Sequence, residues 1–145
     1  MRLPMGLLTL SMALGLASAV TVPSGAKLCV SQGEGSCQFA AYELQPTDTC
    51  EDLQKNAAFI YNHKCELIGY KENFVDKEAI DSQLPYTVDI LRTYGGPFDC
   101  SVQYKIGYSD GTYGYGNPSG GVWGSCTESG YQCNYYRVAF SCPGF

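Results

Sequence analysis

His63, the only histidine in the chain, is the first side chain to consider for acid–base chemistry. General acid–base catalysis would pair it with a second histidine or with a carboxylic acid of raised pKa. Lys64 and Glu66 lie nearby in the sequence, but all three residues fall where a predicted helix ends. A histidine at the C-terminus of a helix is stabilised by the helix dipole, which is a sufficient structural reason for its presence. We therefore assign no catalytic role to His63.

The 14 acidic residues offer a second kind of chemistry, because glycoside hydrolysis uses two carboxylates held at a fixed separation across a cleft. Between residues 72 and 81, however, the acids are interspersed with lysine, as on a solvated helix face. No EF-hand pattern includes Asp110, Asn117 or Glu128. The sequence therefore predicts a protein that is not an enzyme and that binds neither a metal ion nor a cofactor.

Aromatic side chains are concentrated between residues 104 and 136, where most of the tyrosines and the only tryptophan occur. Aromatic rings stack against sugar rings or pack against another protein, and neighbouring glycines let a loop approach its partner closely. The alternative is a structural role. Alternation along a strand would place half of these rings in the core, and tyrosine at an outward strand position is simply a good strand former. Tyr113, Tyr115 and Trp123 instead fall in a hairpin or loop. We therefore predict a binding site formed by Tyr108, Tyr113, Tyr115 and Trp123.

The chain has 8 cysteines, an even number that in a secreted protein indicates four disulfides. No C-x-x-C pair occurs, which argues against a zinc site. Eight cysteines allow 105 pairings, and the sequence does not select among them. A helix between Cys50 and Cys65 would hold these two too far apart to bond, so one or both should join a sheet cysteine such as Cys100 or Cys142. The expected disulfide residues are Cys29, Cys37, Cys50, Cys65, Cys100, Cys126, Cys133 and Cys142.

Residues 1–19 have the three parts of a secretory signal peptide. Arg2 supplies the positive charge, Met5–Leu16 is the apolar run, and Ala17-Ser18-Ala19 matches a cleavage site. A membrane anchor is the alternative interpretation of the apolar segment, but the cleavage tripeptide and the interrupting Pro4 favour a signal that is removed. We therefore expect a secreted, extracellular protein that consists of one domain over residues 20–145.

The pattern of residues in that domain predicts an α+β fold. Alternating apolar and polar residues predict strands over 98–108 and 133–142, and shorter apolar stretches predict a hairpin within 28–44. Apolar residues spaced three to four apart predict a helix over 49–64, and a shorter helix is expected over 76–84. The sequence thus predicts an antiparallel sheet of four to six strands packed by one or two helices and stapled by about four disulfides.

These features together resemble the small secreted cysteine-rich proteins of filamentous fungi. This class includes plant-pathogen effectors and proteins similar to killer toxins. The resemblance rests on the signal peptide, the short mature chain, the four expected disulfides and the lack of a catalytic motif. It implies extracellular action on a host or a competitor, usually by binding rather than by catalysis, and it assigns a role to no individual residue.

We therefore expect an effector-like binding protein that acts in the apoplast, as a monomer, on a host protein or a cell-wall glycan. The alternative is a small secreted toxin or hydrolase, similar to a killer toxin or a ribonuclease. The formal charge of −5 and the single histidine argue against this alternative, because RNA and anionic membranes repel an acidic protein. For the same reason we expect neither a nucleic acid nor a membrane as the partner.

Overall fold

The computed structural model describes residues 20–45, 55–96, 99–108 and 121–145, and for residues 92–96 and 99–103 it describes the backbone alone. This part of the chain is all β and contains no helix. The strands are β1 (Ser36–Gln45), β2 (Lys55–Tyr61), β3 (Leu67–Glu72), β4 (Glu78–Ile80), β5 (Val88–Gly96), β6 (Asp99–Tyr108), β7 (Val122–Glu128) and β8 (Tyr131–Ser141).

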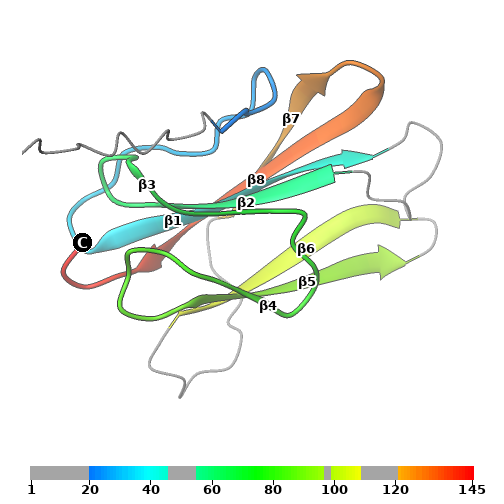
Figure 1. The fold of residues 1–145 in the computed structure, drawn as a ribbon. Coiled ribbons are helices and arrows are strands. Elements are labelled where there is room, and N and C mark those ends of the chain that lie inside the picture. The colour runs from blue at the N-terminus through cyan, green and yellow to red at the C-terminus, as the bar shows by residue number, and fades with distance from the viewer. Residues whose placement is uncertain (1–19, 46–54, 97–98, 109–120) are drawn as a thin grey trace, which may run out of the picture.

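The eight strands form two antiparallel sheets that lie one over the other (Figure 1). Sheet A has five strands in the order β3-β2-β1-β8-β7, and sheet B has three in the order β4-β5-β6. In sheet A, β1 is central, with Ala41 opposite Ala58 of β2 and Tyr136 of β8. In sheet B, Ile90 of β5 pairs with Ile106 of β6. The architecture is a small β-sandwich.

The predicted α+β fold is wrong, and the longer of the two predicted helices shows why. Residues 55–61 of that segment are strand β2, while residues 46–54 lie outside the described part. Both faces of β2 are covered, so its central residues Asn56–Ile60 are all buried. A strand buried on both faces shows no alternation of apolar and polar residues, and such a run cannot be told from a buried helix by periodicity. Ala57 and Ile60 have the three-residue spacing of one helix face, but they lie on opposite faces of the strand.

The shorter predicted helix, over residues 76–84, is also absent. Lys77 has φ of +61° in the left-handed region, which a right-handed helix cannot accommodate. The next residues form β4, which pairs with β5, and Ser82 then forms a bridge to Gly69 of β3. The acidic residues of this segment therefore lie along a strand and its flanking turns, and not along one helix face.

The strands predicted from alternation agree with the structure. β6 and β8 coincide with the two alternating segments, and Gly130, with φ of +81°, forms the turn between β7 and β8. In the first predicted hairpin, Cys37–Leu44 lies within β1, whereas Leu28–Val30 is not a strand. Asp110-Gly111, the predicted turn after β6, lies outside the described residues.

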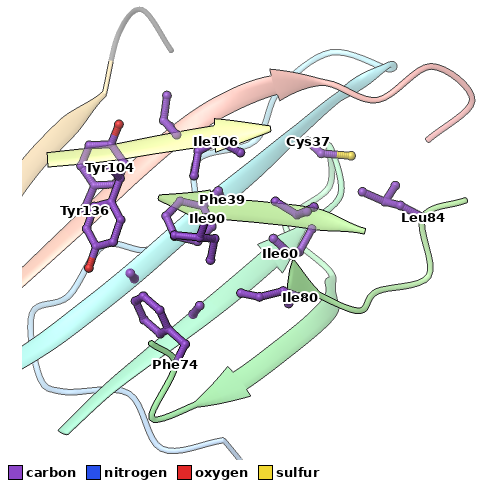
Figure 2. Close-up of a cluster of buried hydrophobic side chains, with 14 of the residues drawn as sticks. Cys37, Phe39, Ile60, Phe74, Ile80, Leu84, Ile90, Tyr104, Ile106 and Tyr136 are labelled. Atoms are coloured by element: carbon purple, nitrogen blue, oxygen red, sulfur yellow. The ribbon is translucent and has the colours of Figure 1, made fainter. Parts of the chain in front are cut away.

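The core lies between the two sheets (Figure 2). Phe39 of β1 and Ile60 of β2 face Ile90 of β5 across the gap, and all three are fully buried. Each such side chain contributes roughly 1.5–3 kcal/mol through burial of apolar surface. Phe74, in the connection between β3 and β4, packs into the same cluster.

The opposite face of sheet A carries a second apolar cluster. Tyr42 of β1 and Phe59 of β2 belong to it, with Leu28 of the N-terminal segment. Figure 1 shows this segment on the side of sheet A that faces away from sheet B. Gln38 fastens it to β1, because the Gln38 side chain accepts a hydrogen bond from Val30 N (3.0 Å) and donates one to Val30 O. Sheet A is thus a central layer with both faces covered.

Three disulfides join cysteines of the described residues, which confirms the disulfide-rich, cysteine-rich character expected from the sequence. They are Cys29–Cys65, Cys37–Cys142 and Cys126–Cys133. Cys65 lies in the turn between β2 and β3 and bonds to Cys29 of the N-terminal segment, which confirms that Cys50 and Cys65 do not bond to each other. Cys142 does not bond to Cys50 or Cys65. Cys50 and the side chain of Cys100 lie outside the described part.

Candidate functional site

The two long sides of the sandwich differ, and this difference positions the candidate site. At one side β3 and β4 hold the sheets together: Gln83 N donates a hydrogen bond to Ile68 O (2.9 Å), and Lys71 forms an ion pair with Glu78. At the other side the edge strands are β6 of sheet B and β7 of sheet A, and no strand pairing joins them among the described residues. We call this second side the open side.

Trp123 of β7 lies at the open side with 43% of its surface exposed. Its ring centroid is 5.7 Å from that of Tyr104 on β6, with an interplanar angle of 23°, and 4.9 Å from that of Tyr136 on β8. Tyr104 and Tyr136 are themselves buried and stacked, with ring centroids 5.2 Å apart (Figure 2). The tryptophan is therefore an exposed ring supported from below by two fixed rings.

A buried carboxylate anchors this aromatic cluster from inside. The Tyr104 hydroxyl donates a hydrogen bond to Oε1 of Glu43, which is only 2% exposed. Glu43 lies opposite Asn56 of β2 and Asn134 of β8 in the register of sheet A, so polar side chains surround it. A buried carboxylate is tolerated only with hydrogen-bonding partners, and charge-assisted hydrogen bonds are among the strongest. The bond to Glu43 therefore fixes the orientation of the Tyr104 ring.

Tyr136 is held equally firmly. Its ring covers the backbone of Gly121, where a Cβ atom would overlap the ring. Burial raises the pKa of Tyr136 above its usual value of 10.0, so its hydroxyl stays protonated. Tyr104 and Tyr136 thus form a rigid, uncharged support for the exposed Trp123 ring, and we call these three side chains the aromatic platform. The exposed tryptophan ring suits stacking against a sugar ring or packing against an apolar side chain of a partner.

The structure places the four predicted binding residues in different positions. Trp123 is exposed, but it lies in strand β7, paired with Tyr136, and its predicted position in a hairpin or loop is wrong. Tyr108 is half-buried and packs against Phe140 and Tyr86, with ring centroids 5.3 Å and 5.8 Å away. Tyr108 lies four residues along β6 from Tyr104, a distance of about 13 Å on a strand, so it does not share the platform. Tyr113 and Tyr115 lie outside the described residues.

Sequence reasoning missed three residues of the site. Tyr104 and Tyr136 were recognised only as members of an aromatic-rich region, because alternation shows which face a ring occupies but not which rings meet. Glu43 gave a weak signal, as a lone acid at the end of the apolar stretch Cys37–Leu44. An acid that faces the core of a strand is uncommon, since charged residues are almost never fully buried unless paired.

His63 lies far from the platform, in the turn between β2 and β3, so its expected position at a helix end is wrong. It lines a cavity of about 510 Å³ with Glu34, Gly35, Gly144 and Phe145. Its Nδ1 atom is buried and has no hydrogen-bond partner among the described residues. No described residue therefore orients the ring through this nitrogen. We still assign no catalytic role to His63.

The described residues contain neither a metal-binding cluster nor a membrane-spanning helix. No group of three or more histidine, cysteine or acidic side chains there could hold a metal ion. The same residues contain no helix of the length and apolarity needed to cross a membrane. The exposed aromatic platform is the feature of this part of the chain that most resembles a binding site.

Comparisons with known proteins add no relative. A scan against family models finds no match, and searches of the curated proteins and of the solved structures find none either. We therefore infer a function from the geometry of the chain itself.

Proposed function

We propose that this chain is a secreted, disulfide-stabilised binding protein of the effector-like class, and that it acts outside the cell on a host protein or a glycan without catalysis. The observation that carries the proposal is Trp123, a large apolar side chain left 43% exposed on a rigid support. Tryptophan and tyrosine are the residues that most often anchor interfaces, and rigid aromatic anchors lose little conformational entropy on binding.

The disulfides support the extracellular part of the proposal. All six cysteines with described side chains are bonded in pairs, and none is free. Disulfides form and persist in oxidising environments and are rare in the cytosol. The proposal includes a signal peptide over residues 1–19, whose cleavage would release the chain into such an environment.

The test is capture of a partner by purified protein carrying Trp123→Ala. The wild-type protein is immobilised and exposed to host apoplastic extract and to a glycan array, in parallel with the variant. Loss of an aromatic anchor costs about 1–2 kcal/mol or more, so capture should weaken by at least about tenfold. Val75→Ala is the matched control, because Val75 is exposed and apolar but lies in the connection between β3 and β4.

The controls separate loss of contact from loss of fold. Circular dichroism and thermal unfolding of Trp123→Ala should resemble those of the wild type, because the hydrogen bond of Tyr104 to Glu43 remains. Normal capture by a folded Trp123→Ala protein would refute the role of the platform. Cleavage of RNA or lysis of competitor cells by the wild-type protein would instead favour the alternative, a small secreted toxin or hydrolase.

A further inference from the structure

A second candidate site lies on the opposite face of sheet A from the aromatic platform. It is a pocket of about 270 Å³ lined by Thr21, Pro23, Tyr42, Leu44, Lys55, Glu128 and Tyr131. These residues come from four segments: the N-terminal segment, β1, β2 and the hairpin that joins β7 and β8. Trp123 and Tyr136 face the core side of sheet A, whereas Tyr42 faces the outer side. The pocket is therefore separate from the platform.

The walls of the pocket are fixed. The N-terminal wall is tied to β7 by the bridge between Ser24 and Thr127, in which Thr127 N donates to Ser24 O (2.8 Å). On the opposite wall, Glu128 and Tyr131 are cross-strand neighbours at the end of the hairpin that the Cys126–Cys133 disulfide closes. A site built on such constrained elements loses little entropy when a ligand binds.

Three polar groups of the pocket have unused hydrogen-bonding capacity. Tyr42 lines the pocket, and its hydroxyl forms no hydrogen bond with a described residue and is not among the fully buried polar atoms. Within the same part of the chain, the Lys55 ammonium and the Glu128 carboxylate form no hydrogen bond or ion pair. All three groups can therefore form hydrogen bonds with a ligand in the pocket.

The electrostatics of the pocket restrict what that ligand can be. Burial raises the pKa of Tyr42, and the negative charges of Glu72 and Glu128 raise it further, so the hydroxyl keeps its proton and acts as a donor. Lys55 and Glu128 carry opposite charges, so together they favour neither an anionic nor a cationic ligand. A neutral ligand that both donates and accepts hydrogen bonds satisfies all three groups.

We propose that this pocket binds one pyranose unit of a neutral glycan. The sugar ring would pack against Tyr131, which is 41% exposed, and its hydroxyl groups would meet Tyr42, Lys55 and Glu128. The volume of about 270 Å³ lies just below the range of about 300–1,000 Å³ that accommodates drug-sized ligands, which suits a ligand of roughly one sugar. This inference rests on the proposed function and specifies its glycan branch.

The experiment titrates the purified oxidised protein with three oligosaccharide series of equal length by calorimetry and ligand-observed NMR. One series is neutral, one carries free amino groups and one carries carboxylates. We expect saturable binding of a neutral oligosaccharide only. Tyr42→Phe removes the hydroxyl and keeps the ring, and Glu128→Gln removes the charge and keeps the shape; each should weaken binding about five- to tenfold.

Tyr61→Phe is the matched control, because Tyr61 also packs on the outer face of sheet A but does not line the pocket. It should leave binding unchanged. If both pocket variants bind the neutral oligosaccharide as tightly as the wild type does, the pocket is not the glycan site. The proposed function would still hold, and loss of that binding in Trp123→Ala would place the glycan on the platform. Tighter binding of a charged oligosaccharide series, or no glycan binding at all, would also refute the proposal that the pocket binds a neutral sugar. The proposed function itself fails if the wild-type protein captures neither a host protein nor a glycan.

Discussion

Sheets A and B share one core, but they are stabilised to different extents. Sheet A has five strands, both of its faces are covered, and all three described disulfides lie within it or its flanking segments. Sheet B has three strands, and among the described residues no second layer covers its outer face, where Asp89 and Lys105 are partly exposed. Sheet A is therefore the more constrained of the two sheets. Outside the shared core, sheet B is joined to it by the hydrogen bond from Gln83 N to Ile68 O and by the ion pair between Lys71 and Glu78.

This difference matters for function because both candidate sites are built mainly on sheet A. Trp123, Tyr136 and Glu43 of the platform belong to its strands, and only Tyr104 comes from sheet B. The outer pocket has no residue from sheet B. Loosening of sheet B should therefore impair the platform before it impairs the pocket. Three sets of substitutions test whether sheet B is held less firmly than sheet A.

The largest effect is expected from the cysteines that lie outside the described side chains, Cys50 and Cys100. If all eight cysteines are oxidised within one chain, these two can only bond to each other, and the bond would join the connection between β1 and β2 to β6 of sheet B. Replacing both with serine should lower the free energy of unfolding by about 4 kcal/mol, as closure of a loop of this length predicts. Denaturant unfolding measures the loss.

The pairing itself is checked by mass spectrometry of the unreduced protein. Alkylation before reduction should add no label, and proteolysis should release a peptide pair that contains both Cys50 and Cys100. A labelled thiol at either position would refute the fourth disulfide. The control is the Cys126–Cys133 pair: it closes a loop of only seven residues within sheet A, so replacing it should cost less.

The intermediate effect is a difference of about 1–2 kcal/mol between two phenylalanines on opposite faces of sheet A. Phe39 and Phe59 are both fully buried, but Phe39 packs toward sheet B and Phe59 toward the N-terminal segment. Phe39→Ala should cost about 3–5 kcal/mol, because two regular sheets cannot close the cavity. Phe59→Ala should cost about 1–2 kcal/mol less, since an irregular segment relaxes more readily into the space. Equal costs in denaturant unfolding would contradict this difference between the faces.

The smallest effect concerns the ion pair between Lys71 of sheet A and Glu78 of sheet B. The pKa of the Glu78 carboxyl is lowered by the hydrogen bond from Lys71 and by that from Val75 N (2.8 Å). A lowered pKa in the folded state stabilises the protein above the usual pKa of a glutamate, and this contribution is lost as the pH falls through the lowered value. Glu78→Gln should therefore destabilise the protein at pH 7 by about 0.5 kcal/mol, the scale of an exposed ion pair.

Denaturant unfolding at pH 7 and at about pH 3 measures this effect, and the wild type and Glu78→Gln should converge at the lower pH. Glu34→Gln is the control, because Glu34 is exposed and forms no ion pair among the described residues. A difference between wild type and Glu78→Gln that persists unchanged at acidic pH would show that the carboxylate charge is not what stabilises this edge.

How much the sequence could predict depended on how many faces of a strand are buried. β6 and β8 were predicted, because apolar and polar residues alternate along both. β2 was mistaken for a helix because sheet B covers one of its faces and the N-terminal segment packs on the other. Alternation of apolar and polar residues identifies a strand when one of its faces is buried and the other is exposed. It does not identify a strand that is buried on both faces.

The candidate sites follow the same rule. The sequence by itself determined that the chain is rich in cysteine and disulfides and that its aromatic side chains are concentrated between residues 104 and 136. Only the tertiary structure decided that Tyr104 and Tyr136 support this ring, that Glu43 holds Tyr104, and that Tyr42 opens into a pocket. These residues come from strands far apart in the chain, and their proximity is set by strand order and sheet packing. Sequence spacing encodes neither of these, because both arise from burying distant apolar surfaces against one another.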